Sequence, residues 1–259
     1  MNDFNILRNT LHEARAPGKE LDVFFRDDDA DDDLPNLHRL IDTFQNYAAT
    51  VNLAVIPGTL TASGAELLLK RQERMPQCME LHQHGWIHAN HESTGRKCEF
   101  GPSQSYNQQF RNILRGRERL TEVFGGNRNR LFIPPWNRCT RDTLRVLKAL
   151  EFAGISRDVS AELLEGVTVR EVPVTFDINT WKTGPRLKTN VEIADALSRQ
   201  VNAGACIGVL LHHKVMTSEA FQMLDNVLSI FSSAPNIRIK SLGDLVGRSA
   251  GETIQTCTV

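Results

Sequence analysis

The sequence predicts an α/β protein in which seven or eight strands, alternating with helices, form a single barrel. Three observations favour this fold. Short apolar runs rich in β-branched and aromatic residues alternate with longer segments of helical period, which is the pattern of βα units around a parallel sheet. The chain has 259 residues, a length at which barrels commonly form one domain. No Pro-, Ser- or Gly-rich linker divides it, so we expect one domain over residues 1–259, with its core at about 20–245.

Strands are expected where the apolar runs are short, and helices where apolar residues recur every three to four positions. The predicted strands are 21–26, 50–56, 78–84, 130–134, 154–156, 167–175, 206–212 and 237–240. The predicted helices are 36–47, 65–74, 106–124, 141–152, 191–201 and 218–232. In such a barrel the loops after the strands converge on one mouth, where the active site forms. Chemically capable side chains cluster at the ends of the first, third, fourth and seventh strands, which predicts a site at that mouth.

Composition argues against several classes of protein. The 30 Lys and Arg are scattered among 31 Asp and Glu, and the net charge of −1 predicts no nucleic-acid partner. No apolar run approaches the roughly 18 residues of a membrane span, and the polar residues 1–19 lack the apolar core of a secretory signal. The five cysteines are odd in number and form no CxxC pair, which suits thiols in a reducing compartment. We therefore expect a cytoplasmic protein.

The histidines are unevenly distributed. Six of the eight fall in two places, four of them within residues 82–91 and two at His212 and His213. His84 and His88 are four residues apart, so one helical turn would bring both imidazoles within reach of one ion. The alternative interpretation is a polar, solvated loop with one structural histidine. We expect His82 and His91 to lie outside the ligand set.

An acidic run ends the first predicted strand. Asp27, Asp28 and Asp29 directly follow Arg26, whereas residues 31–33 are typical of a solvated loop. Three adjacent carboxylates repel one another unless a cation or an arginine offsets their charge. The run lacks the glycine and the spaced ligands of a calcium loop. Two histidines and one carboxylate, with open positions for water, are a set that divalent metals use to activate water.

Five motifs of the chain resemble those of the polysaccharide deacetylases, carbohydrate esterase family 4, and they occur in the family's order. FRDDDA resembles the first motif, two aspartates and a small residue at a strand end. ELHQHGWIHANH is similar to the second, in which a glutamate, here Glu80, precedes two histidines separated by three residues. FIPPWN resembles the third motif, TFDINTW with Asp177 resembles the fourth, and GVLLHH is similar to the fifth. Together they extend from residue 21 to residue 213.

The resemblance implies a distorted (β/α) barrel with about seven strands, and hydrolysis of an N- or O-linked acetyl group on a saccharide or sugar conjugate. It implies that Asp29, His84 and His88 bind the metal, that Asp28 is the base and that His212 is the general acid. The implied cofactor is one divalent ion, with Zn²⁺ preferred and Co²⁺, Ni²⁺ or Mn²⁺ able to use the same ligands. The implied substrate is an acetylated sugar, a sugar nucleotide or a lipid-linked saccharide.

The chain departs from the family pattern at two points. Ile133 stands where the third motif has an arginine that orients the base, and Arg26 or Arg138 would have to supply that group from another position. Ala30 replaces the glycine that normally follows the aspartate pair. The register of the motif is therefore open by one residue, and the alternative assigns the two roles to Asp27 and Asp28.

Further residues are expected around the substrate. Trp86 lies between the two proposed ligands and is a candidate sugar platform. The third motif offers Pro135 and Trp136 as pocket walls, although a rigid turn after the fourth strand explains the same residues. The fourth motif offers Trp181, for which a core position is the alternative. Arg26, His91 and His213 are expected to support the site without touching substrate.

Two other functions stay open at this point. A non-catalytic descendant of the same fold that binds saccharide or metal is favoured by the missing arginine at position 133. A non-haem iron enzyme is the other alternative, because two histidines and a carboxylate also describe that kind of site. Ligands on the first and third strands of a barrel do not favour iron chemistry.

Overall fold

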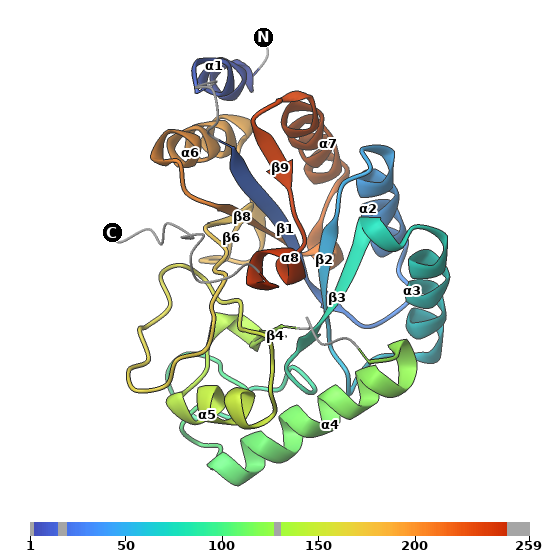
Figure 1. Cartoon of the computed structure of the whole chain (residues 1–259), viewed down its shortest axis with the longest axis vertical. Helices are drawn as coiled ribbons and strands as arrows, with labels where there is room; N and C mark the ends of the chain where they lie inside the picture. The colour runs from blue at the N-terminus through green and yellow to red at the C-terminus, as the bar shows by residue number, and fades with distance from the viewer. Residues whose placement is uncertain (1–2, 15–19, 127–130, 248–259) are drawn as a thin grey trace.

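The computed structural model describes residues 3–14, 20–126 and 131–247 (Figure 1). Its strands are β1 Leu21–Ala30, β2 Val51–Val55, β3 Met79–His84, β4 Phe132–Ile133, β5 Phe176–Asp177, β6 Asn179–Thr180, β7 Arg186–Leu187, β8 Ile207–Leu211 and β9 Ile237–Ile239. Its helices are α1 Asn5–Glu13, α2 Pro35–Asn46, α3 Ala62–Arg74, α4 Tyr106–Phe124, α5 Arg141–Ala149, α6 Asn190–Ala203, α7 Ser218–Ser233 and α8 Leu242–Gly247. Short 3₁₀ turns lie at Pro76–Cys78, Pro135–Asn137 and His213–Val215.

Seven strands form one parallel sheet that curls into a half-barrel. Their order is β4-β3-β2-β1-β8-β5, and β9 pairs with the first residues of β1. The strand β1 is central, because β2 and β9 pair along one of its edges and β8 along the other. The α/β barrel of about seven strands predicted from the sequence is therefore confirmed. The short hairpin of β6 and β7 lies outside this sheet.

The strands predicted at 154–156 and 167–175 are wrong. These segments contribute only isolated bridges, which join Ile155 to Phe132 and Glu171, and Asp158 to Val174. Pro173 has no N–H to donate to a ladder, which limits regular pairing there. The circuit of the barrel between β4 and β5 is thus completed by irregular chain. The predicted strand 130–134 begins at a residue outside the described part of the chain.

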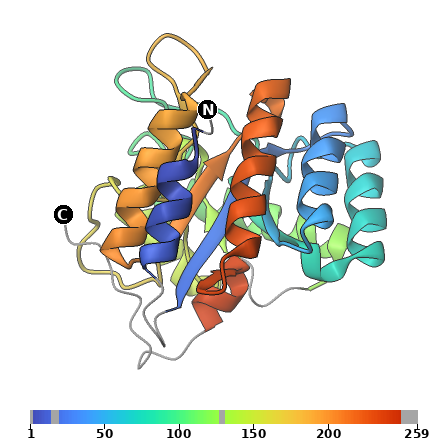
Figure 2. The same ribbon diagram turned by 90° about the horizontal axis from the view of Figure 1, so that it is seen from above.

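The two faces of the sheet serve different purposes. Outward-facing side chains such as Val23 and Phe25 join the largest core cluster, which also contains apolar residues of α1, α2, α6 and α7. Figure 2 shows these helices and α3 arranged along one side of the sheet. The intervening Phe24 belongs instead to an inner cluster with Leu210 and the apolar residues of α8. Arg26 and Asp28 continue this inner series along β1, where both are buried.

Polar side chains on the inner face fix α8 at the amino-terminal half of the strands. Asn52 on β2 accepts a hydrogen bond from the backbone N–H of Leu242 at 2.8 Å. Glu80 on β3 accepts another from Gly243 at 2.8 Å, and the His82 imidazole contacts both Asn52 and Glu80. The helix α8 therefore covers one end of the half-barrel, while the carboxyl ends of β1, β3 and β8 stay available for a site.

Two expectations from composition can be compared with the described residues. None of the cysteines at positions 78, 98, 139 and 206 forms a disulfide, and Cys257 lies outside the described residues. Over the same part of the chain, every helix is too short or too polar to traverse a lipid bilayer.

Candidate active site

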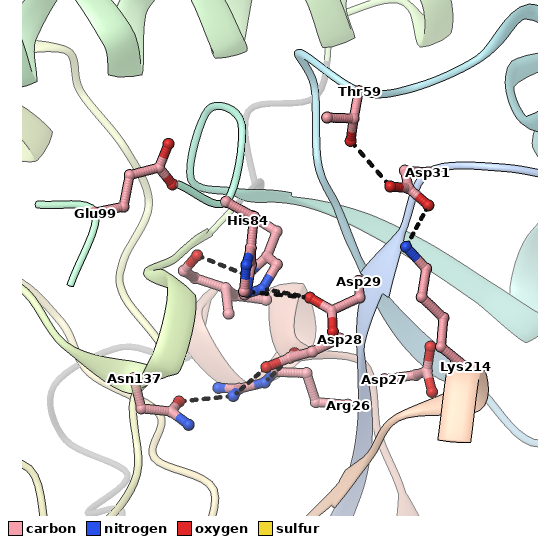
Figure 3. A network of polar contacts seen from close by, with 12 residues as sticks. Arg26, Asp27, Asp28, Asp29, Asp31, Thr59, His84, Glu99, Asn137 and Lys214 are labelled. Atoms are coloured by element: carbon pink, nitrogen blue, oxygen red, sulfur yellow. Dashed lines mark hydrogen bonds and ion pairs between the residues drawn. The ribbon is translucent and has the colours of Figure 1, made fainter. Parts of the chain in front are cut away.

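A bulge at the end of β1 directs two neighbouring aspartates into one site. Asp27 pairs with Leu53, but Ala30 pairs with Val55, so β1 contains one more residue than β2 over this stretch. Asp29 has a φ of +76°, in the left-handed region. Neighbouring residues of a regular strand point to opposite faces, and a bulge removes this alternation. As a result Asp28 and Asp29 both lie beside His84 (Figure 3).

Asp29, His84 and His88 bring three ligand atoms together. The Asp29 Oδ1 lies 3.3 Å from Nε2 of His84 and 3.2 Å from Nε2 of His88, and one atom from each residue lies within 4.8 Å of the others. Tetrahedral zinc with ligands at about 2.0–2.1 Å separates neighbouring ligand atoms by roughly 3.3 Å. The buried Asp29 Oδ1 has no hydrogen-bond partner within the described chain. The three side chains therefore fit a divalent cation.

The ring nitrogen of His84 that faces away from Asp29 forms a hydrogen bond to the backbone. Its Nδ1 donates to the carbonyl oxygen of Ile133 at 3.0 Å. This bond fixes the tautomer in which Nε2 carries the lone pair, and Nε2 is the atom that faces Asp29. Ile133 thus contributes through its backbone, although its side chain replaces the arginine of the third motif.

The charges of the cluster influence one another strongly. Burial by itself raises the pKa of Asp29. The neighbouring His84, His88 and His212 lower this pKa by more than burial raises it, so the pKa lies below its usual range. Burial and the nearby His84 both lower the pKa of His88. At neutral pH this arrangement favours a carboxylate beside a neutral His88 imidazole, which are the protonation states that bind metal.

The helical turn predicted between His84 and His88 is wrong. Residues 85–88 form no helix. Gly85 has a φ of +58° and His88 a φ of +55°, so two left-handed residues reverse the chain directly after β3. This turn brings the two imidazoles to a centroid distance of 5.1 Å, and the indole of Trp136 lies 4.3 Å from the ring of His88 on the other side.

Arg26 binds Asp28 in a two-point ion pair. Its Nε and Nη2 donate to the two carboxylate oxygens of Asp28, both at 2.9 Å. Arg26 is fully buried, and its remaining donors bond to Ser156 and to the side chain of Asn137. Arg138, the other arginine considered from the sequence, donates to the carbonyl of Lys97 instead. Arg26 therefore occupies the position next to the predicted base.

Asp27 has a different partner from Asp28. Its two oxygens accept hydrogen bonds from the backbone N–H of His213 at 2.7 Å and from its Nδ1 at 2.6 Å. Both side chains are fully buried. This pair joins the end of β1 to the turn after β8, and it favours the register in which Asp28 and Asp29, rather than Asp27 and Asp28, belong to the site.

His212 follows the last residue of β8 and lies on the Trp181 side of the site. Its ring is 4.7 Å from the Trp181 ring in an edge-to-face arrangement. The indole Nε1 of Trp181 donates to Asp177 at 2.7 Å. Burial raises the pKa of Asp177, and the charge of the nearby His212 opposes this rise, as it opposes the effect of burial on Asp29. His212 therefore lies near the ligand cluster and near the fourth motif. Its Nδ1 is buried without a partner in the described chain.

The remaining predicted residues have mixed positions. Pro135 is buried in the turn after β4, and Trp136 follows it with a φ of +56°. Trp181 keeps 47% of its surface exposed, which leaves one face of its ring available. Trp86 packs against the core cluster around Phe100 and is partly buried. The backbone of His91 bonds to Cys98 in the following loop. The roles assigned to these side chains stay predictions.

Three residues of the site had no role in the sequence-based account. Ser156 and Asn137 hold Arg26, and Asn137 belongs to the quoted FIPPWN motif. Glu99 is buried next to the turn after β3. An isolated glutamate in a loop has no periodicity or spacing that would have identified it.

Comparison with known proteins gives the family. The polysaccharide deacetylase family model matches residues 26–155, and the chain belongs to this family. No curated protein matches the chain. Among solved structures, a family 4 acetyl xylan esterase from Clostridium thermocellum, in complex with cobalt, is similar with a TM-score of 0.55 and 15% identity, over 86% of this chain and 89% of that one.

Other similar structures include an esterase and a pseudoenzyme. A family 4 carbohydrate esterase from Streptomyces lividans, in complex with acetate, gives a TM-score of 0.53 and 12% identity over 87% of this chain and 94% of that one. A family 4 pseudoenzyme from Bacillus anthracis gives a TM-score of 0.50 and 12% identity, over 86% of this chain and 64% of that one. The shared fold therefore does not decide activity, which depends on the residues of the site.

Proposed function

We propose that this protein is a metal-dependent deacetylase that hydrolyses an N- or O-linked acetyl group of a saccharide or sugar conjugate. The observation that carries the proposal is the arrangement around the ligand cluster of Asp29, His84 and His88. Asp28, held by Arg26, lies in the same site, and His212 lies close enough for its charge to act on Asp29. Family membership supports the same chemistry.

Asp29, His84 and His88 would hold one divalent ion, for which we propose Zn²⁺, with Co²⁺, Ni²⁺ or Mn²⁺ as alternatives. Such an ion supplies Lewis-acid polarisation of the acetyl carbonyl and makes a water molecule more acidic. The protein would supply two nitrogen ligands and one oxygen ligand. The cobalt in the Clostridium thermocellum esterase is consistent with this choice of ligands.

Asp28 and His212 would move the protons of the reaction. Asp28 accepts the proton of the attacking water, and the two-point contact with Arg26 keeps its carboxylate oriented. His212 donates a proton to the departing amine or alkoxide, because an amine expelled without a proton is a very poor leaving group. Asp177, whose carboxyl group lies close enough to His212 for the two charges to interact, would stabilise the protonated imidazole.

Tryptophans would bind the sugar. The indole of Trp136 lies next to His88, a proposed ligand. The indole of Trp181 lies next to His212, the proposed acid. Sugar rings pack well on such apolar faces. We propose Trp136, Pro135 and Trp181 as substrate contacts and leave Trp86 out, because it packs against the core. Acetylated sugars, sugar nucleotides and lipid-linked saccharides stay the candidate substrates, and a cytoplasmic location stays a prediction.

The test is release of acetate from a panel of acetylated xylo-oligosaccharides, chito-oligosaccharides and acetylated sugar nucleotides, with the protein loaded with Zn²⁺ or Co²⁺. We expect acetate from at least one substrate, loss of the reaction after chelation, and a rate lower by about 10²–10⁴-fold with Asp28→Asn. Saccharide binding without acetate release would support the non-catalytic alternative. Uptake of O₂ that depends on Fe²⁺ would instead support an iron enzyme.

A further inference from the structure

Glu99 is a buried carboxyl group that the proposed reaction does not use. It is fully buried, and burial raises its pKa above the usual range in spite of nearby hydrogen bonds and histidines. Its oxygens point at the backbone that follows β3. The Oε1 accepts from the N–H of Ile87 at 2.8 Å, and both oxygens lie 3.3 Å from the N–H of Trp86. Figure 3 shows Glu99 on the loop beside His84.

These N–H groups belong to the turn that carries one ligand histidine to the other. The turn begins at Gly85 and ends at His88, and both have positive φ values. A left-handed conformation at a residue other than glycine is strained and persists only where the surroundings hold it. Glu99 accepts hydrogen bonds from two backbone N–H groups inside this turn, so it holds the turn from within.

The start of the turn is shaped around the same carboxylate. A Cβ added to Gly85 would lie 2.1 Å from Oε2 of Glu99 and 2.7 Å from the ring of Pro135. Glycine is therefore required there for its backbone conformation and for the space that Glu99 occupies. The backbone between the two ligands and the buried carboxyl group thus fit one another closely.

We infer that Glu99 is a positioning residue that fixes the 85–88 turn, and through it the His88 imidazole, in the geometry that binds metal. The inference rests on the proposed metal site. Without the carboxylate, the N–H groups of Trp86 and Ile87 lose their partner in a partly buried place, where an unpaired donor is costly. The turn then relaxes, and His88 moves relative to His84 and Asp29.

The test is the affinity of the metal-free protein for Co²⁺. This affinity is measured by calorimetry and by the visible absorption of the bound ion. Glu99→Ala removes both acceptors, Glu99→Asp keeps the charge but shortens the side chain, and Glu99→Gln keeps one acceptor oxygen. The matched control is Glu92→Ala, because Glu92 lies on the same loop but bonds to Ser103. Thermal unfolding of each metal-free variant separates a change at the site from a general loss of stability.

We expect Glu99→Ala and Glu99→Asp to bind Co²⁺ about 10- to 100-fold more weakly, the usual effect of removing a supporting group, with an altered absorption spectrum. Glu99→Gln should recover most of the affinity, and Glu92→Ala should match the wild type. Wild-type affinity and spectrum in Glu99→Asp would overturn the inference, whether or not Glu99→Ala folds. A wild-type protein that takes up no Co²⁺ would instead overturn the proposed metal site, and with it this role.

Discussion

Asp27 and Asp28 are chemically identical neighbours on β1, but they have different partners. Asp28 faces Arg26 on the inner side of the sheet, and Asp27 binds His213. Strand alternation explains this separation, since adjacent side chains point to opposite faces. The bulge at Asp29 then returns the next carboxylate to the site. A run of three aspartates thus contains a structural residue, a proposed base and a proposed ligand.

Replacing Asp28 with asparagine should leave the metal bound and reduce turnover by about 10²–10⁴-fold, the range that general base catalysis supplies. The amide keeps the shape of the side chain but cannot accept the proton of the attacking water. Metal content and the rate of acetate release, measured on the same preparation, check this result. Undiminished turnover in Asp28→Asn would mean that another group is the base.

His212 and His213 should respond differently to replacement by alanine. His212→Ala should keep fold and metal while turnover falls by about 10²–10⁴-fold, because it removes the proposed acid. His213→Ala removes the imidazole that pairs with the buried Asp27 carboxylate, and breaking a buried pair typically costs about 3–5 kcal/mol of stability. Urea unfolding and acetate release distinguish the two. Normal activity in His212→Ala, beside a stable but inactive His213→Ala, would show that the acid is the other histidine.

The site was predictable from the sequence where its residues follow strands at short spacing. Asp29, His84 and His88 could be proposed because two motifs place them at the ends of strands that lie side by side in a barrel. The partner of Asp28 could not be chosen, because pairing between Arg26 and Asp28 depends on the inner face of β1 being closed by Ser156 and Asn137. Glu99 reaches the site only through the folded loop, so no local pattern indicates it.

At the scale of elements, the site depends on irregular backbone at the ends of regular strands. Asp29, His88 and Trp136 all have positive φ values, and they lie after or at the end of β1, β3 and β4. Strain of this kind is held by surrounding contacts and is common at functional sites. The strands place these turns next to one another, and the turns orient the side chains.

The turn after β3 gives a direct test of this dependence. Gly85→Ala should destabilise the protein and weaken metal binding, because the new Cβ meets Glu99 and Pro135 and the φ is +58°. The control is Gly95→Ala, whose φ is +78° but whose Cβ would meet nothing within 4 Å. The stability of that control should fall only by the cost of placing alanine in the left-handed conformation, about 1–2 kcal/mol. Equal effects of the two substitutions on Co²⁺ affinity would contradict a specific role for the turn.

Regular helices were easier to predict than short strands. The helix α4 has the predicted bounds, because its apolar period is long and a capping box of Ser105 and Gln108 marks its start. The end of β1 was missed, since the charged residues 27–29 conceal a buried strand. The segments 154–156 and 167–175 have strand-like composition, but their pairing is decided by the closure of the barrel, which is a property of the whole fold.

At the scale of the molecule, the proposed metal joins β1 to the turn after β3, so binding should stabilise the fold. A ligand at 100 times its dissociation constant adds about 2.7 kcal/mol, which corresponds to a rise of roughly 5–11 °C in Tm for a domain of this size. Zn²⁺ or Co²⁺ should produce this shift in the wild type and in His91→Ala. His84→Ala and His88→Ala should show none. A shift retained in both of these variants but lost in His91→Ala would mean that the ligand set is wrong.

Hydrolysis by this protein should require one divalent ion held by Asp29, His84 and His88, and a metal titration tests this requirement. Metal-free protein is titrated with Zn²⁺, and the rate of acetate release is followed on the best substrate of the panel. We expect a rate that rises from the background and reaches its maximum at about one equivalent of ion, with no rise in His88→Ala. A rate that is independent of the ion, or bound ion without any acetate release, would contradict it.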